Sequence, residues 1–230
     1  MRLVSALTRT AVLMVLSSAA VAVQGEPDRV VYGGGVTAKG WMGKIIDASS
    51  IQQGRTINDS KFAQVGSALI LNIGPAAIYW NPANELKGDY TVRATFKETN
   101  YLKINSHPHP YGIFIAGNKL DTDKPSLFYC APYGNGTFIV RGFKDGVPGG
   151  GAPKPHDKVN KADGPGGTVT QDVEINVKAG RVSCVINGGV VATFDKAQVV
   201  GPGKLDSTDG IAGIRVSHNL DVTITGWSAK

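Results

Sequence analysis

The sequence has few of the patterns that membrane spans, nucleic-acid-binding surfaces and cysteine metal sites require. Its apolar runs are short, and the one near the N-terminus, Ala11 to Leu16, is too short to cross a bilayer. Only two cysteines occur, Cys130 and Cys184, and neither has a second cysteine or a histidine at ligand spacing. The net charge is +6, but the lysines and arginines form no cluster interleaved with aromatic residues, so nucleic acid is not an expected partner.

The first 22 residues have the pattern of a secretory signal peptide. Arg2 and Arg9 precede the apolar run, and Ala20-Val21-Ala22 provides an A-x-A-like cleavage site. The alternative, a membrane anchor, would need a longer span and a stop-transfer pattern. We therefore expect cleavage near Ala22, a secreted or periplasmic location, and no membrane insertion after cleavage. Removing the two arginines lowers the net charge from +6 to +4.

The clearest structural pattern lies between Val169 and Phe194. Apolar residues alternate with polar ones in two segments, with the apolar sets Val173, Ile175, Val177 and Val182, Cys184, Ile186. Asn187-Gly188-Gly189 supplies the positive φ angles of a tight hairpin turn, after which Val190 to Phe194 returns as a third strand. This period of two over three strands predicts an antiparallel sheet with one face on a core.

The rest of the chain predicts more short strands separated by turns. The expected strands are 68–73, 76–80, 89–98, 112–116, 127–131, 136–143, 211–216 and 220–224. With no convincing helix and turns at regular spacing, they indicate one all-β domain, an antiparallel β-sandwich over residues 68–230. Residues 23–67 are expected to be irregular and to pack on the sandwich.

One segment breaks the strand pattern. Lys144 to Thr168 is rich in glycine, proline and lysine, and Val147 and Val159 are its only large apolar residues. Such a composition buries too little surface to order itself, so we expect a mobile loop that proteases cut early. A functional loop is the alternative.

The two cysteines leave two interpretations open. Each lies in a strand-like run, and an oxidising compartment would permit a disulfide between them. Alternatively, each is a small buried hydrophobic residue on its own strand. The sequence gives no Cα separation, so it does not decide between the two.

Three stretches resemble the concanavalin A-like superfamily, which includes the laminin-G-like domains. They are VEINVKAGRVSCVINGGVV at 173–191, DGIAGIRVSHNLDVTITGW at 209–227 and GIFIAG at 112–117. Within the superfamily the chain looks most like secreted bacterial domains grouped with 3-keto-disaccharide hydrolases. The resemblance covers 68–227 loosely and implies an antiparallel jelly-roll β-sandwich of the concanavalin A-like type. This fold hosts lectins, glucanases and adhesion modules, so it implies no single activity.

A glycoside hydrolase needs two carboxyl groups that face one sugar. The glucanases of this superfamily place them on one strand as Glu-x-Asp-x-Glu or a version one residue longer. None of the chain's four glutamates begins that motif: Glu26, Glu85, Glu98 and Glu174. Asp172-Val173-Glu174 has the alternation of a same-face pair, but Asn176 and Lys178 follow it. We favour solvated residues on an outer strand there, and no catalytic residue is assigned.

Sugar binding requires aromatic rings that stack on a pyranose and planar polar groups for its hydroxyls. The candidates lie at strand ends, in the loop 101–111, in a turn, or as polar residues within apolar strands: Tyr79, Trp80, Asn81, Tyr101, His107, His109, Tyr111, Tyr133, Asn135, Arg141 and His218. For Trp80 an ordinary core tryptophan is the alternative. For Arg141 and His218 it is a hydrogen-bonded residue on the wetter sheet face.

Metal binding is the less favoured interpretation of the histidines. His107-Pro108-His109 places two imidazoles one residue apart, but a site needs further ligands that the sequence does not locate. We therefore predict no metal site and no cofactor. Calcium is common in the superfamily, and Asp121-Thr122-Asp123 or Asp206 to Asp209 could donate oxygens. Both are equally good turn sequences, and we prefer the turn interpretation.

Together these patterns predict a secreted carbohydrate-binding β-sandwich whose loop residues form the site. The first alternative is a sugar hydrolase related to the 3-keto-disaccharide hydrolases. The second is a cell-envelope interaction module without a small ligand. The sequence leaves the glycan, any catalysis and the oligomeric state undetermined.

Overall fold

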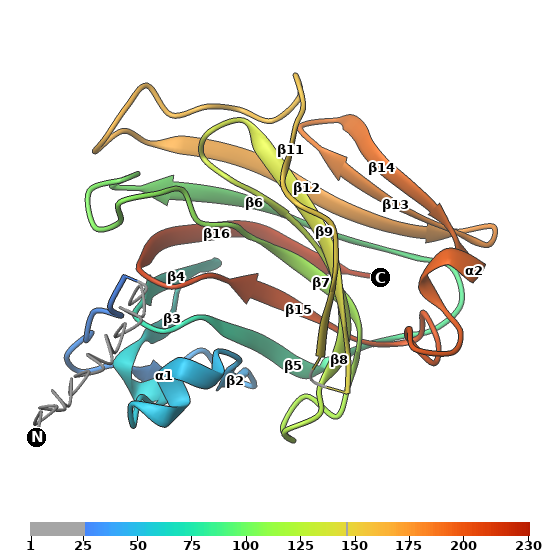
Figure 1. Ribbon diagram of the computed structural model, residues 1–230, viewed down its shortest axis with the longest axis horizontal. Coiled ribbons are helices and arrows are strands. Elements are labelled where there is room, and N and C mark those ends of the chain that lie inside the picture. The colour runs from blue at the N-terminus through green and yellow to red at the C-terminus, as the bar shows by residue number, and fades with distance from the viewer. Residues whose placement is uncertain (1–25, 146) are drawn as a thin grey trace, which may run out of the picture.

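The chain folds into a β-sandwich of two sheets, most of whose strand pairs are antiparallel (Figure 1). The structure is a computed structural model, and it describes residues 26–145 and 147–230. The predicted signal peptide, residues 1–22, lies outside the described residues. Among the described helices, none is long and apolar enough to cross a membrane.

The first sheet, here called the β6 sheet, has eight described strands. Their order is β1 (Gly35–Val36), β3 (Lys61–Val65), β4 (Ala68–Ile73), β16 (Leu220–Ala229), β6 (Tyr90–Thr99), β12 (Val169–Lys178), β13 (Arg181–Ile186) and β14 (Gly189–Asp195). Only the short β1–β3 pair is parallel among these neighbours.

The second sheet, here called the β7 sheet, lies over the first. Its order is β10 (Val147–Gly150), β9 (Thr137–Lys144), β8 (Ser126–Pro132), β7 (Tyr111–Asn118), β15 (Gly210–Val216), β5 (Ala77–Leu86) and β2 (Met42–Ile45), with β11 (Lys154–Pro155) paired to β9. In Figure 1, β7, β8 and β9 run across β6, β12 and β16 of the other sheet. The helices are short: α1 (Ala48–Gln52), the 3₁₀ turn η1 (Ile57–Asp59) and α2 (Lys196–Val199).

The structure confirms the three-strand meander of the C-terminal half. β12, β13 and β14 follow one another, and the apolar residues of β12 and β13 point into the core. Asn187 and Gly188 have φ angles of 49° and 76°, as the predicted hairpin turn requires. The predicted strand at 112–116 is confirmed as β7, and it is buried on both faces from Tyr111 to Gly117.

Three segments differ from their predicted structure. The segment 144–168, predicted as a mobile loop, contains regular structure: β10 and β11 both pair with β9, and Val159 is buried in the core. Residues 23–67 are not all irregular, since β1, β2 and β3 join the two sheets. The strand predicted at 76–80 is longer, because β5 continues through Asn81-Pro82 to Leu86. Its pairing with β15 shifts register between Ile211 and Gly213.

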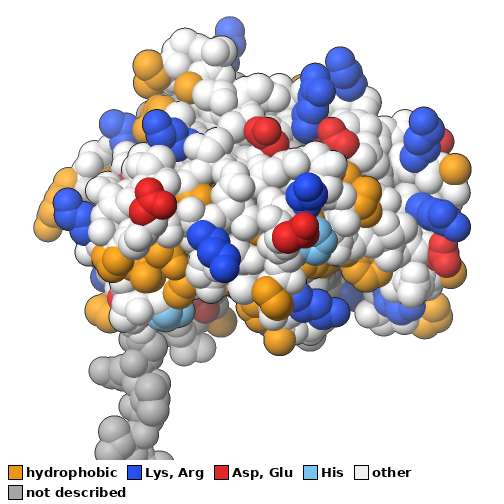
Figure 2. Space-filling view, turned by 90° about the horizontal axis from the view of Figure 1, so that it is seen from above, with side chains coloured by type: hydrophobic (Ala, Val, Ile, Leu, Met, Phe, Trp, Pro, Cys, Tyr) orange, Lys and Arg blue, Asp and Glu red, His pale blue; other side chains and the backbone are white. Residues whose placement is uncertain are grey.

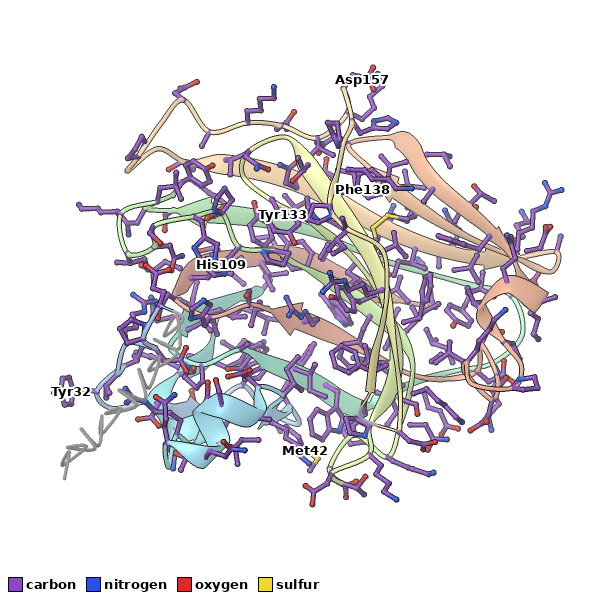
Figure 3. All side chains as sticks on the ribbon, viewed as in Figure 1. Tyr32, Met42, His109, Tyr133, Phe138 and Asp157 are labelled. Carbon is purple, nitrogen blue, oxygen red and sulfur yellow. A yellow bond between two sulfur atoms is a disulfide. The ribbon has the colours of Figure 1, made fainter. Side chains whose placement is uncertain are left out.

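A disulfide joins Cys130 of β8 to Cys184 of β13. Their Cα atoms lie 6.0 Å apart, within the range of native disulfides. Both side chains point into the core from opposite sheets, so the bridge fastens the two layers together (Figure 3). This resolves the alternative that the sequence left open.

The outer face of the β7 sheet carries a second apolar cluster. Its buried members are Ile78, Trp80, Phe114, Leu120, Leu127, Tyr129, Ala131 and Ile139. Because both faces of this sheet are apolar, alternation along its strands does not distinguish core from surface.

The lysines and arginines are scattered over the face of the molecule in Figure 2 and form no single basic patch there.

Candidate functional site

The candidate site is a pocket of about 500 Å³ at one end of the β7 sheet, here called the rim pocket. This volume lies within the range of small-molecule sites. Its lining comes from the β6–β7 loop, β8, the β8–β9 turn, β9, the β10–β11 loop and the end of β15. The lining residues are His107, Pro108, His109, Pro110, Tyr129, Tyr133, Asn135, Thr137, Arg141, Pro153, Arg215 and Ser217. In Figure 3, His109 and Tyr133 lie on the same side of the sandwich.

Strand register places the floor of the pocket on the outer sheet face. Phe114 pairs with both Gly213 and Tyr129, and Tyr129 pairs with Arg141. Arg215 lies two residues after Gly213 on β15 and therefore points to the same face. The pocket thus lies on the side of the sheet away from the main core.

Two arginines and two tyrosines meet in this floor. The guanidinium carbon of Arg215 lies 5.1 Å from the centre of the Tyr129 ring, and its Nε is buried without a hydrogen-bond partner among the described residues. Arg141 donates from Nε to the Gly151 carbonyl at 3.1 Å. Burial raises the pKa of Tyr133, while nearby Arg215 and Arg141 oppose that rise. Among the lining residues that the structure describes, none is acidic.

The segment that begins at Glu26 is anchored at the edge of the rim pocket. Arg29 pairs with Asp221 at 2.6 Å and donates from Nε to the Ile73 carbonyl at 2.8 Å. Burial by itself would raise the pKa of Asp221, but hydrogen bonds from Arg29 and others outweigh it and lower that pKa. Asn219 of the β15–β16 turn bonds both the Arg29 amide and the Pro27 carbonyl. These contacts fix Glu26 and Asp28 beside the histidines.

Three histidines and one glutamate converge at this edge. Glu26, His107, His109 and His218 each offer a ligand atom within 4.8 Å of the others. The His109 ring lies 4.3 Å from the His107 ring and 4.2 Å from the His218 ring, between centroids. Burial, together with the neighbouring His218, His107 and Arg215, lowers the pKa of His109 to about 3. His109 is therefore a neutral imidazole at neutral pH.

A buried carboxyl group lies behind the pocket, on the core side of the sheet. Glu98 is buried beneath the β8–β9 turn, where a Cβ added to Gly134 would come within 2.7 Å of its Oε2. Burial raises the pKa of Glu98 to about 7, and the nearby Tyr111 hydroxyl only partly offsets this. At Oε2 the carboxyl has no hydrogen-bond partner among the residues described.

This carboxyl group should make stability depend on pH. The pKa of Glu98 is about 7 in the folded state and 4.5 in the reference state, so its contribution is fully present below pH 4.5 and is lost as pH rises through 7. We expect Glu98→Gln to raise the free energy of unfolding relative to wild type by up to about 3 kcal/mol at pH 8, and by little at pH 4. Urea denaturation of both proteins from pH 4 to 8 measures this difference.

Glu174→Gln is the matched control, because Glu174 lies on the outward side of neighbouring β12. Its profile should follow that of wild type. His109 also makes stability depend on pH, but in the opposite direction: its depressed pKa lowers the free energy of unfolding as pH falls. Because wild type and both variants share this contribution, it cancels in the difference between their free energies of unfolding. A constant difference between Glu98→Gln and wild type across the range would contradict the prediction.

The structure brings together six of the predicted site residues. His107, His109, Tyr133, Asn135 and Arg141 line the rim pocket, and His218 lies against His109. Arg215 and Ser217 also line the pocket but were not predicted. A signal for Arg215 was present, because it is a charged residue within an apolar strand, as Arg141 is.

The other predicted site residues lie elsewhere, and this corrects the prediction. Tyr79, Trp80, Tyr101 and Tyr111 are at most 6% exposed, so their rings are covered by neighbouring side chains and cannot stack on a sugar. Asn81 accepts a hydrogen bond from the Ala83 amide in its own strand and does not line the rim pocket.

Sequence reasoning also missed Glu26 and Asp28. Glu26 and His107 are 81 positions apart in the sequence, and the contacts of Arg29 and Asn219 hold the two residues close together. No local pattern signals such a contact. The prediction of no metal site rested on missing third and fourth ligands, and the structure supplies candidates for both in Glu26 and His218.

The two acidic turns considered for calcium have other contacts. The Lys44 ammonium lies 3.4 Å from Asp123 and bonds the Thr122 carbonyl. Asp206 pairs with Lys144 at 2.6 Å, and Asp209 accepts from the Gly88 amide. Three of these carboxylates, Asp123, Asp206 and Asp209, therefore have protein partners.

A second cavity, of about 480 Å³, opens between the sheets at the edge formed by β9 and β14. Phe128, Phe138 and Phe194 line it, and each belongs to the main core or packs on it. It is mainly apolar and shares only Arg141 with the lining of the rim pocket.

Comparison with solved structures assigns the fold. The chain resembles the carbohydrate-binding module CBM66 of Bacillus subtilis with a TM-score of 0.54 and 10% identity, over 84% of this chain and 97% of the module. It also resembles sheep galectin-11 with a TM-score of 0.38 and 18% identity, over 60% of this chain and 92% of the galectin. The likeness to CBM66, together with the two sheets described above, shows a β-sandwich fold of the concanavalin A-like type.

Comparison at the level of sequence finds no relatives. No protein-family model matches the chain, and no curated protein matches it either. The finer resemblance to 3-keto-disaccharide hydrolase-like domains therefore stays a hypothesis. At 10% identity the structural likeness concerns the fold alone, so function has to be argued from the rim pocket.

Proposed function

We propose that this protein binds carbohydrate in the rim pocket. The observation that carries the proposal is the convergence of a half-buried aromatic ring, Tyr133, with planar polar groups on Asn135, Arg141 and His107 in one open pocket. An aromatic ring can stack on the apolar face of a pyranose, and planar amide and guanidinium groups can bond its hydroxyls. The module with the similar fold is named a carbohydrate-binding module, which agrees with this proposal.

The charges of the pocket favour a sugar that carries a carboxylate. Arg141 and Arg215 both face the space beside Tyr133, and none of the described residues that line the pocket is acidic. A guanidinium group binds a carboxylate through two parallel hydrogen bonds. We therefore propose uronic-acid-containing glycans as preferred ligands over neutral ones.

The test is a glycan array followed by titration calorimetry with the best acidic oligosaccharide. We expect Arg141→Gln to weaken binding by about 10–100-fold, because a hydrogen bond to a charged group contributes about 1.5–3 kcal/mol. Tyr133→Ala should weaken binding of acidic and neutral glycans alike, since stacking does not depend on charge.

Arg93→Gln is the matched control, because Arg93 is exposed on β6 and lies outside the rim pocket. It should bind as wild type does. Equal binding by Arg141→Gln and wild type would remove the rim pocket from the proposal. An array on which the wild-type protein binds no glycan would favour the interaction module without a small ligand.

Glycoside hydrolysis is the second candidate, because one carboxyl group, that of Glu26, lies at the edge of the rim pocket, 3.6 Å from His109. A hydrolase of the usual type needs two such groups, and the Oε2 atom of Glu26 is buried, so hydrolysis would require this side chain to move. Release of reducing ends from the oligosaccharides that bind would support hydrolysis, and its absence over long incubation would argue for binding alone.

We also propose that the protein is exported. The disulfide supports this proposal, because such bridges persist outside the cytoplasm.

A further inference from the structure

We propose that Glu26, His107, His109 and His218 bind one divalent transition-metal ion of the zinc type at the edge of the rim pocket. Three imidazoles and one carboxylate are a ligand set that zinc accepts. Their four ligand atoms lie within 4.8 Å of one another. Calcium and magnesium prefer all-oxygen sites, so the nitrogen donors argue against them.

The distances fit ligands around an ion better than direct hydrogen bonds. Glu26 Oε2 lies 3.6 Å from His109 Nε2 and 3.7 Å from His107 Nδ1. Both are too long for a hydrogen bond. Two ligands that each lie about 2.0–2.1 Å from a tetrahedral zinc ion are about 3.4 Å apart. Small side-chain shifts would therefore close the site around an ion.

Two of these atoms are buried with their bonding capacity unused. Glu26 Oε2 and His109 Nε2 are both inaccessible to solvent, and neither has a hydrogen-bond partner within the described part of the chain. Buried polar atoms of this kind are rare in native proteins and call for an explanation such as an ion. Here the two face each other across the centre of the cluster.

Neighbouring groups bond the other polar atoms of Glu26, His109 and His218, in the way that hydrogen-bonded neighbours orient metal ligands in other proteins. His218 Nδ1 lies 2.8 Å from Asp28 Oδ1, and His109 Nδ1 lies 3.1 Å from Ser217 Oγ. Each contact leaves the other ring nitrogen, Nε2, for an ion. The Ser106 amide donates to Glu26 Oε1 at 2.7 Å and leaves Oε2 free in the same way.

With four protein ligands the ion would be structural, because no coordination position is left open for water. It would tie together the N-terminal segment, the β6–β7 loop and the β15–β16 turn. His107 and His109 also line the rim pocket, so the ion would fix one wall of that pocket. The Glu26 carboxylate, and the Asp28 carboxylate behind His218, would offset the charge of the ion.

The experiment titrates zinc chloride and cobalt chloride into the protein after treatment with a chelator, using protein without a polyhistidine tag. We expect one ion per chain by calorimetry and visible cobalt absorption of tetrahedral intensity. At a zinc concentration about 100 times Kd, Tm should rise by about 5–10 °C. Calcium and magnesium should neither bind at this site nor raise Tm.

Variants assign the ligands. Glu26→Gln keeps the shape of the side chain, and His107→Ala changes a side chain that is 59% exposed, so neither should prevent folding. Each should weaken zinc binding by at least about 100-fold, since the loss of a group that only hydrogen-bonds a ligand already costs about 10–100-fold in metal affinity. His156→Ala is the matched control, because His156 is the chain's remaining histidine and lies outside the cluster.

Unchanged zinc affinity in both Glu26→Gln and His107→Ala would overturn the proposal, and so would a loss of binding in His156→Ala. Absence of zinc or cobalt binding to the folded wild-type protein would do the same. The metal titration contains no glycan, and glycan binding can be measured on either form. Failure of the metal site and failure of the proposed carbohydrate function are therefore distinguishable.

Discussion

Reduction of the Cys130–Cys184 disulfide should lower the free energy of unfolding by about 4 kcal/mol, because the bridge closes a loop with a sequence separation of 54 residues. For a chain of this size that corresponds to a fall in Tm of about 8–16 °C. The loss is expected to be large because the bridge joins the two sheets and because both sulfurs lie in the core. Urea denaturation with and without a phosphine reductant measures it.

The reductant needs to be added to the unfolded protein, since both cysteines are at most 1% exposed in the folded state. The double variant Cys130→Ala/Cys184→Ala is the control, and its unfolding should not respond to the reductant. Two reactive thiols per chain in the unfolded, unreduced wild-type protein would contradict the bridge. Equal urea midpoints under both conditions would contradict its contribution to stability.

The fold was largely predictable from the sequence, because alternation and turn chemistry are local. In strands β6, β12 and β13, the apolar residues of the alternating pattern are the buried ones, and the apolar run of β7 is buried throughout. The burial of Glu98 could also have been predicted from alternation. Glu98 continues the parity of Tyr90 to Phe96 on β6 and is therefore directed into the core.

The candidate site was only partly predictable, because tertiary contacts bring its members together. Glu26 and His218 come from opposite ends of the described chain. They meet because the Asn219 side chain accepts from the Arg29 amide and donates to the Pro27 carbonyl. The β10 and β11 strands could not be predicted either. Their composition is that of a loop, and pairing to the edge strand β9 supplies the order that their own side chains do not.

Trp80 shows the same limit on a single residue. It ends an apolar run in which Ile78 and Trp80 alternate with Ala77 and Tyr79, so both sheet faces are apolar and alternation cannot show which is solvated. The structure places Trp80 in the second apolar cluster, 4% exposed, with Phe114 and Ile78. The tryptophan is thus part of a core and not a platform for a sugar ring.

Replacing Trp80 by alanine should therefore act on stability and not on binding. We expect the free energy of unfolding to fall by about 3–5 kcal/mol, as for other large-to-small core changes, and Tm to fall by about 6–20 °C. At a temperature where the variant is folded, its affinity for the glycan bound by wild type should stay within about twofold, since Trp80 does not line the rim pocket. Thermal unfolding and calorimetry on one sample measure both quantities.

Tyr32→Ala is the control for loss of an aromatic ring, because Tyr32 is 92% exposed and projects from the sandwich (Figure 3). Its free energy of unfolding should change by at most about 0.5 kcal/mol, as is usual for surface substitutions. A Trp80→Ala protein that melts like wild type but has lost glycan binding would place the sugar against Trp80. The site would then lie nearer β5 and β2 than the rim pocket does, because Trp80 pairs with Met42 on β2.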